Sequence, residues 1–270
     1  MQTSEIDPHG TAFSTRGSGP PLLLIHGVGL DATIWDRMLP ELARHHRVIV
    51  FDMLGHGASP RPGPDVTLHD YAVQACRLID HLGIAACAVA GFSMGALVVE
   101  EMAISFPPRV TRLAAISGVY SRTLEQQLAV RTRALEIAVR GVAHLIAPAL
   151  ERWLTPQFRA ANPELVQSIE KRMRENDATG YLRSQAIFAT ADVDLAHRVD
   201  AIRCPALIVT GEHDAGSTPE MATGLAARIA GSQVVIMPGL RHLLPIEAPA
   251  ALARLIIEFL HDDNATLEQR

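Results

Sequence analysis

The stretch from Cys87 to Phe106 restricts the fold of this chain more than any other part of the sequence. Cys87 to Ala90 is a short apolar run typical of a buried strand, and a helical pattern follows it closely. Between the two lies Gly91-Phe92-Ser93-Met94-Gly95. A chain that turns so sharply from strand into helix brings backbone against backbone, where a Cβ at either glycine would collide. The stretch therefore predicts a strand–turn–helix corner with the Ser93 hydroxyl projecting above the end of the strand.

Further strand and helix patterns alternate through the first 117 residues. The order is β-α-β-α-β-α-β, and the strands are too apolar for one face to be exposed to water. We therefore expect a mostly parallel, doubly wound α/β sheet with helices on both faces and right-handed crossovers. The other expected elements here are strands at 22–25, 48–51 and 112–117 and helices at 35–44, capped by Asp31 or Thr33, and at 68–82.

The region from 120 to 197 has a different pattern, because strand-like runs disappear and helical segments follow one another. These segments cover 123–142, 143–153, 163–176 and 180–190. A region this long is too large for a loop, so we expect a helical cap insertion over the strand ends. Strands at 206–211 and 233–237 and helices at 219–229 and 248–260 then complete the sheet. The predicted division is a core domain over 1–119, a cap over 120–197 and the rest of the core over 198–270.

Composition excludes several classes of function. The formal net charge is −5, which offers no basic surface for nucleic acid. The first ten residues lack a secretory pattern, and no apolar run is long enough to span a membrane. Cys76, Cys87 and Cys204 lie in apolar patterns and are odd in number, which favours reduced thiols and a cytoplasmic protein. No clustered metal ligands are found in the sequence, so no metal is expected.

Three residues that follow predicted strands form a candidate catalytic set. Ser93, Asp214 and His242 come in the chain order serine, acid, histidine that is typical of doubly wound hydrolases. Asp214 is expected to orient one ring nitrogen of His242, and the other nitrogen to accept the Ser93 proton. Glu212 and Asp192 are alternatives for the acid. Asp214 is favoured over Glu212 because Glu212 still lies close to the strand.

An attacked carbonyl also needs hydrogen-bond donors for its developing negative charge. The backbone N–H of Met94 is one candidate because it follows the nucleophile, and Val28, in the loop after the first buried strand, is the other. We interpret Asp52 and the Gly55-x-Gly57 turn as structural.

Together these residues resemble the α/β-hydrolase family with a helical cap. The match extends from Pro21-Leu22-Leu23-Leu24-Ile25-His26-Gly27 to Pro245-x-Glu247-x-Pro249. Serine at position 93 disfavours the members with an aspartate nucleophile, the dehalogenases and epoxide hydrolases. Two departures from the family pattern are Pro219, five residues after Asp214 instead of four, and Leu243, where an aromatic residue is common.

The cap is similar to that of 3-oxoadipate enol-lactonases and their relatives. The similarity is carried by Glu151-Arg152-Trp153-Leu154-Thr155-Pro156-Gln157-Phe158 and by Gly180-Tyr181, with Ala186 and Asp192 beyond. It implies hydrolysis of a small lactone or ester bearing carboxylates, in bacterial aromatic catabolism and without a cofactor.

Several alternatives remain open from the sequence. One alternative is a carbon–carbon bond hydrolase of aromatic meta-cleavage products, which uses the same triad. Another is a cofactor-free haloperoxidase or perhydrolase-like esterase. A small-molecule receptor on a hydrolase scaffold is the alternative from another class. The oligomeric state is open, and a homodimer is compatible with the sequence.

Residues that contact the substrate are predicted from side-chain chemistry alone. Arginine binds a carboxylate through two parallel hydrogen bonds, and aromatic rings line pockets for small ligands. The candidate arginines are Arg122, Arg131, Arg133 and Arg152, and the candidate aromatic residues are Trp35, Trp153, Phe158, Tyr181 and Phe188.

Overall fold

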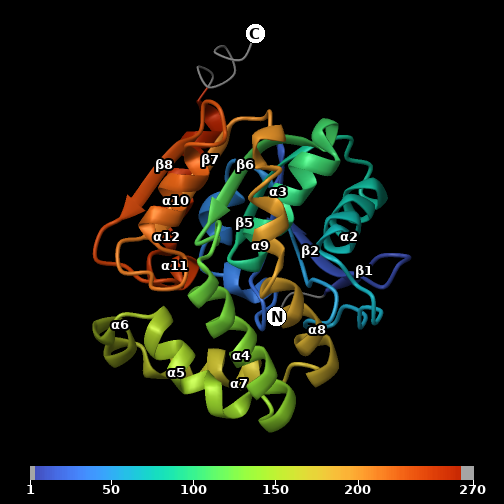
Figure 1. The fold of residues 1–270 in the computed structure, drawn as a ribbon. Coiled ribbons are helices and arrows are strands. Elements are labelled where there is room, and N and C mark those ends of the chain that lie inside the picture. Colours follow the sequence, from blue (N-terminus) through green and yellow to red (C-terminus); the bar gives the residue numbers. More distant parts are fainter. Residues whose placement is uncertain (1–3, 263–270) are drawn as a thin grey trace.

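The computed structural model describes residues 4–262, and an eight-stranded sheet forms its centre (Figure 1). The strands are β1 (Glu5–Ile6), β2 (Ala12–Arg16), β3 (Pro21–Ile25), β4 (Arg47–Phe51), β5 (Cys87–Phe92), β6 (Val110–Ile116), β7 (Ala206–Gly211) and β8 (Gln233–Met237). Their order in the sheet is β1-β2-β4-β3-β5-β6-β7-β8. Strands β3 to β8 pair in parallel, which confirms the expected mostly parallel sheet.

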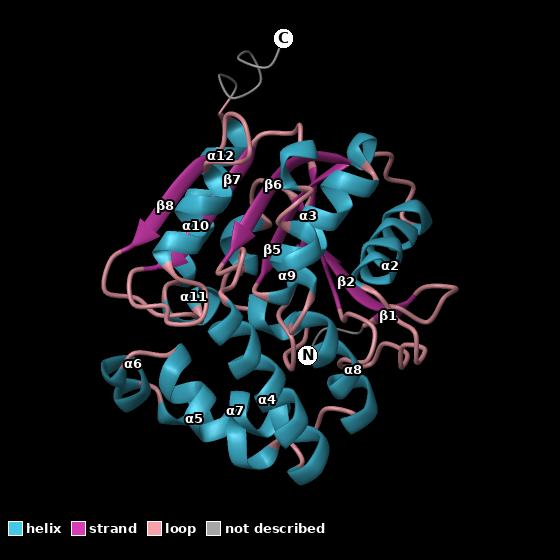
Figure 2. Ribbon diagram, viewed as in Figure 1, coloured by secondary structure: helices cyan, strands magenta, loops and turns pink. Residues whose placement is uncertain are grey.

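Both faces of the sheet are covered by helices (Figure 2). The side chains of β3 explain why its sequence is apolar throughout, because successive residues of a strand point to opposite faces. Leu22 and Leu24 pack in one apolar cluster, and Leu23 and Ile25 pack in the other. The first cluster includes α1 (Leu39–Leu42) and α12 (Pro249–His261), and the second includes α2 (Leu68–His81), α3 (Met94–Ser105) and α10 (Pro219–Ala226).

Five helices lie together beyond the carboxyl ends of the parallel strands, and we call them the cap helices (Figure 1). They are α4 (Leu124–Arg140), α5 (Ala143–Trp153), α6 (Pro156–Ala161), α7 (Pro163–Arg174) and α8 (Ala178–Phe188). The next helix, α9 (Ala191–Leu195), packs against α3. The exact domain limits at 119/120 and 197/198 stay a prediction.

The ends of α4 show how the sequence sets a boundary. Thr123 caps its first turn by accepting the N–H of Gln126, and the Gln126 side chain accepts the N–H of Thr123 in return. Gly141 follows the last residue with a φ of 76°, a left-handed conformation that favours glycine. The reciprocal hydrogen bonds of Thr123 and Gln126 therefore set the start of α4, and the positive φ of Gly141 sets its end.

Two sequence predictions differ from the structure. The single helix expected over 35–44 is instead a short η1 (Ala32–Trp35) followed by α1. Pro40 has no N–H to donate within a continuous helix, and it lies in the first turn of α1 instead. The antiparallel strands β1 and β2 were not predicted. They are short, and β2 becomes a strand by pairing with β4.

The remaining short elements are η2 (Pro107–Arg109), η3 (Val199–Ala201) and α11 (Leu244–Glu247). Within residues 4–262, none of the helices has the length and apolar character needed to cross a bilayer.

Candidate active site

The corner between β5 and α3 holds Ser93 in a strained backbone conformation, with a φ of 56°. A Cβ on Gly91 would lie 2.0 Å from the Gly95 carbonyl oxygen, and a Cβ on Gly95 would lie 2.2 Å from the Ile25 carbonyl oxygen. Both glycines are therefore required by close backbone approach, as the sequence indicates. The Ser93 N–H donates to the Ile116 carbonyl at 2.8 Å, which ties the corner to the neighbouring strand β6.

Ser93, His242 and Asp214 meet at the carboxyl end of the sheet. His242 Nε2 lies 3.2 Å from Ser93 Oγ, and His242 Nδ1 lies 2.7 Å from Asp214 Oδ2. All three residues are buried. The two distances are within hydrogen-bond reach, so the structure brings together the three side chains that the sequence pattern selects.

The Asp214 carboxylate is held in its ionised form. Its Oδ1 accepts the N–H groups of Gly216 and Ser217, each at 2.9 Å. Burial acts to raise the pKa of Asp214, but His242 and these two N–H donors outweigh it and lower that pKa below its ordinary value.

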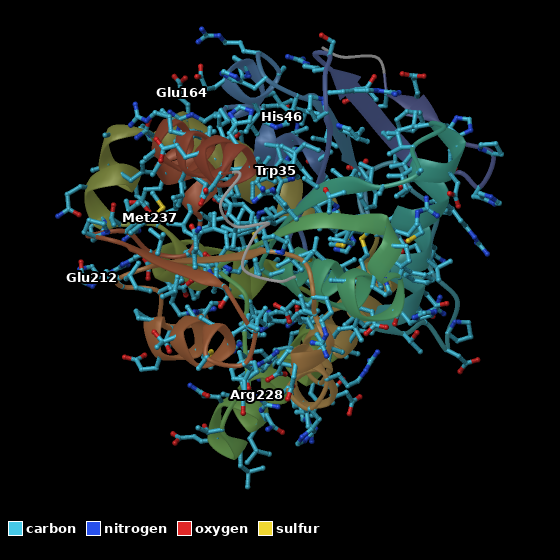
Figure 3. All side chains as sticks on the ribbon, turned by 90° about the horizontal axis from the view of Figure 1, so that it is seen from above. Trp35, His46, Glu164, Glu212, Arg228 and Met237 are labelled. Carbon is cyan, nitrogen blue, oxygen red and sulfur yellow. The ribbon has the colours of Figure 1, made fainter. Side chains whose placement is uncertain are left out.

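The alternative acids are engaged elsewhere. Asp192 makes a buried ion pair with Arg122 at 3.0 Å. Glu212 is exposed at the rim of the molecule (Figure 3), where its Oε2 accepts the Gly239 N–H at 2.8 Å.

Besides the Asp214 carboxylate, two aromatic rings and a hydroxyl group contact His242. The rings of Phe92 and Trp153 lie 5.0 Å and 5.6 Å from it, centroid to centroid. Its backbone carbonyl accepts the Ser117 hydroxyl at 3.0 Å, at the end of β6. The two aromatic rings therefore pack against the imidazole, and the Ser117 hydroxyl holds the backbone of His242.

The loop after β3 lies directly beside Ser93. A Cβ on Gly27 would lie 3.1 Å from Ser93 Cβ. The Leu30 N–H donates to the Gly27 carbonyl at 3.2 Å, so residues 27–30 form a turn whose internal hydrogen bond does not use the Val28 N–H. Met94 is the first residue of α3, so its N–H has no acceptor within the helix. The roles of these two donors stay a prediction.

Two buried histidines hold this loop from the sheet side. His26 Nε2 accepts the Met53 N–H at 2.9 Å, and His56 Nε2 accepts the Gly29 N–H at 3.0 Å. An acceptor nitrogen carries no proton, so both rings are neutral. Burial lowers the pKa of His26 to about 4 and that of His56 to about 3.

These histidines make the stability of the fold depend on pH. An unfolded histidine takes up its proton near the ordinary pKa of about 6.5, whereas the folded rings do so only at much lower pH. Between these values the unfolded chain binds more protons, so the free energy of unfolding decreases as the pH falls. Each histidine contributes up to about 1.4 kcal/mol per pH unit to this decrease.

We therefore expect His56→Gln, compared with the parent between pH 6.5 and 5, to lose up to about 1.4 kcal/mol per pH unit of this slope. Urea unfolding at several pH values measures it. The exposed His197, replaced in the same way, is the matched control and should retain the parent slope. Identical slopes for His56→Gln and the parent would contradict the assignment of a neutral His56.

Asp52 and the Gly55-x-Gly57 turn make structural contacts. Asp52 Oδ1 accepts the N–H of Ala32 and Oδ2 that of Ala58, each at 2.9 Å. A Cβ on Gly57 would lie 2.0 Å from Asp52 Oδ2. The structural interpretation of this motif therefore agrees with its contacts.

A pocket opens over Ser93 and His242. The β3 loop and the cap helices supply most of its lining, which is largely apolar. The lining residues are Val28, Ser93, Arg133, Ile137, Val142, Leu145, Ala149, Arg152, Trp153, Met173, Tyr181, Gln185, Phe188 and His242. Of the predicted substrate contacts, Arg133 and Trp153 are therefore at the pocket, as are Arg152, Tyr181 and Phe188.

Arg133 and Arg152 bring two like charges to this pocket. Burial, and then the neighbouring Arg152 guanidinium, lower the pKa of Arg133, while Glu136 acts in the opposite direction. Burial also lowers the pKa of Arg152. Both guanidinium groups remain charged near neutral pH. Within residues 4–262 neither makes an ion pair, although Arg152 donates to the Pro148 carbonyl at 3.1 Å.

Four predicted substrate contacts do not line this pocket: Arg131 is exposed on α4, and the side chains of the other three pack elsewhere. The Arg122 guanidinium is buried in its ion pair with Asp192 and lies 4.7 Å from the centre of the Phe188 ring. Trp35, labelled in Figure 3, is fully buried within the apolar cluster that also contains α12. Phe158 packs on the outside of that cluster, with the Arg37 guanidinium over its ring.

Sequence reasoning missed Gln185 and Met173 of the pocket, as well as His56 behind the loop. His56 lies inside the glycine turn that the sequence analysis singled out, so its position was a usable signal. Gln185 carried none, because one glutamine in a helical pattern does not indicate which side of the helix faces the pocket. Within the described part of the chain, no three histidine, cysteine, aspartate or glutamate side chains are grouped as a metal site requires.

The model of the alpha/beta hydrolase family matches residues 22–255. This chain belongs to the alpha/beta hydrolase family. The family was expected from the resemblance in its motifs, and both that expectation and the expected fold are confirmed.

Individual α/β-hydrolases resemble the chain over nearly its whole length. A protein of Acinetobacter baylyi named (E)-2-((N-methylformamido)methylene)succinate hydrolase is 32% identical over 251 residues, covering 92% of this chain and 93% of that protein. The 3-oxoadipate enol-lactonase 2 of the same organism is 27% identical over 241 residues, covering 88% of each. The crystal structure of the enol-lactonase from Burkholderia xenovorans LB400 has a TM-score of 0.87 at 27% identity, covering 93% of this chain and 96% of that one. The chain is therefore a member of the family that is close to enol-lactonases.

Proposed function

We propose that the chain hydrolyses a small carboxylic ester or enol-lactone through an acyl-enzyme on Ser93. The observation that supports this most is the continuous contact from Ser93 Oγ through His242 to Asp214 at the base of the pocket. A serine hydroxyl is a weak nucleophile until a base accepts its proton. His242 is positioned to be that base.

The proposed reaction begins with the tautomer that Asp214 selects. The His242 Nδ1–H donates a hydrogen bond to the Asp214 carboxylate, so Nε2 is free to accept the proton of Ser93 while Oγ attacks the carbonyl carbon. The oxyanion of the tetrahedral intermediate accepts the N–H groups of Val28 and Met94. When the intermediate collapses, His242 returns the proton to the leaving alkoxide or enolate. Water, deprotonated by His242, then attacks the acyl carbon, and His242 returns that proton to Ser93 Oγ as the acyl bond breaks and the acid is released.

We further propose that the substrate carries a carboxylate bound by Arg133 and Arg152. Both guanidinium groups line the pocket without an ion-pair partner among the described residues, and each repels the other unless an anion lies between them. The two relatives above are named for a methylenesuccinate and for 3-oxoadipate, which are dicarboxylates by name. A substrate derived from a dicarboxylate can react at one carboxyl carbon, present as an ester or lactone, while its second carboxylate binds Arg133 and Arg152.

Replacing Arg133 with glutamine should lower kcat/KM for a carboxylate-bearing ester by about 10- to 150-fold, because one charge-assisted contact contributes about 1.5–3 kcal/mol. The same change should alter kcat/KM for a neutral ester of similar size by less than about threefold. The exposed Arg131 lies on the same helix and, replaced by glutamine, is the control that should leave both values unchanged. Equal losses for charged and neutral esters would contradict carboxylate binding.

The function itself is tested by four substrates with the purified chain. They are an enol-lactone with a carboxylate, a p-nitrophenyl ester, a vinylogous 1,5-diketone, and the formamido-methylene succinate for which the first relative is named. We expect turnover of the enol-lactone and the ester, with the enol-lactone faster. Turnover of the diketone alone would instead establish carbon–carbon bond hydrolysis, and turnover of the formamido compound alone would establish amide hydrolysis.

A further inference from the structure

Gly29, the residue after Val28, is held from two sides. From the sheet side its N–H donates to His56 Nε2 at 3.0 Å. From the cap side its carbonyl accepts the Asn176 side-chain N–H at 2.8 Å. A Cβ on Gly29, whose φ is +76°, would lie 2.6 Å from the Tyr181 ring, so the ring of this cap residue rests on the glycine itself. The position of Gly29 therefore depends on core and cap together.

The same end of the cap contacts the loop a second time. The Arg172 guanidinium, in the last turn of α7, pairs with both oxygens of Asp31. Asp31 lies two residues beyond Gly29 and caps η1 by accepting the Thr33 N–H at 2.9 Å. The carboxyl end of α7 and the residues after it thus bind the loop through hydrogen bonds at Gly29 and at Asp31.

We propose that Asn176 is a positioning residue that aligns the Val28 N–H for the oxyanion, so that the oxyanion hole is complete only when the cap is seated on the loop. The inference rests on the proposed function. The turn over residues 27–30, which carries the Val28 N–H, has conformational freedom of its own, because the glycine at its third position accepts many backbone conformations. Contacts at the Gly29 N–H and carbonyl remove that freedom.

The chemical consequence is selective for the transition state. A donor aimed at the oxyanion stabilises the charge that develops during attack and contributes little to binding of the neutral ester. Loss of the Asn176 contact should therefore lower kcat while leaving KM nearly unchanged. A contact that only fastened the cap would instead alter substrate binding and stability.

The chain offers a matched control one residue away. Asp177 makes the neighbouring tie between cap and core, accepting the Arg61 Nε–H at 2.8 Å. Arg61→Gln weakens this exposed ion pair without touching the loop at Gly29. Comparing it with Asn176 variants separates alignment of the loop from attachment of the cap.

The experiment compares the parent, Asn176→Asp, Asn176→Ala and Arg61→Gln. Aspartate retains the size of asparagine but cannot donate, and alanine removes the donor without adding charge. We measure kcat and KM for the p-nitrophenyl ester, and the affinity of a trifluoromethyl ketone that adds to Ser93 as an oxyanion, against the corresponding methyl ketone. Circular dichroism establishes that each variant is folded.

Both Asn176 variants should lower kcat by about 10- to 100-fold, which is less than the 10²–10³-fold cost of removing a donor outright. Trifluoromethyl ketone affinity should fall by a similar factor, while KM and methyl ketone affinity stay within about threefold. Arg61→Gln should match the parent. The inference is overturned if the parent is active and the Asn176 variants behave like Arg61→Gln. A parent with no turnover and no ketone adduct would overturn the proposed function, and the inference with it.

Discussion

Replacing Ser93 with alanine is expected to lower kcat for a p-nitrophenyl ester by about 10⁴- to 10⁶-fold, because no other group can form the acyl-enzyme and the residual rate comes from binding and the oxyanion donors alone. The fold should be retained, since within residues 4–262 the Ser93 hydroxyl makes a hydrogen bond to His242 alone. Turnover is measured under conditions of excess substrate, and folding by circular dichroism.

The control for Ser93→Ala is Ser168→Ala, an exposed serine on α7 that should leave turnover unchanged. Mass spectrometry of the parent after reaction with an active-site-directed phosphonate should give one adduct at Ser93 and none in the variant. A purified Ser93→Ala protein with unchanged ester turnover would contradict the serine mechanism.

Asp214→Asn is expected to lower kcat by about 10⁴-fold with little change in KM. An asparagine amide can donate to His242 Nδ1, which places the ring proton on Nε2, where it can no longer accept the proton of Ser93. The loss thus comes from the wrong tautomer, with the surrounding geometry retained by the N–H groups of Gly216 and Ser217.

Glu212→Gln tests the alternative acid on the same loop. Glu212 is exposed and bonded to the Gly239 N–H, so its replacement should change kcat by less than about twofold. If Glu212→Gln lost activity and Asp214→Asn did not, the acid would have been assigned to the wrong residue. Equal, small effects would remove the acid from the proposed mechanism.

The parallel strands and the serine corner were predictable because they depend on local properties of the chain. A continuous apolar run such as 22–25 requires burial on both faces, and the structure has β3 over Pro21–Ile25. The glycines around Ser93 are required by backbone contacts that any such corner must make. The helix at 35–44 was wrong for a local reason as well, since Pro40 interrupts a pattern that is otherwise helical.

The pocket lining could not be predicted in the same way. Arg122 and Arg133 both belong to the first part of the cap. Arg122 is buried against Asp192, whereas Arg133 faces the pocket. In the same way, Trp35 is buried in the core, whereas Trp153 lines the pocket. Periodicity indicates that one side of a helix is buried, but it does not tell whether that side packs on the sheet, on another helix or around a cavity.

The alternation of strands and helices, the corner at Ser93, and the order of serine, acid and histidine after three of the strands could all be inferred from the amino-acid sequence. These follow from backbone sterics and from the apolar character of short segments. Which arginines face the pocket, and how Asn176 reaches Gly29, 147 positions earlier in the chain, became known from the folded structure alone. Such pairings depend on how the cap packs against the core, and no local pattern carries that information.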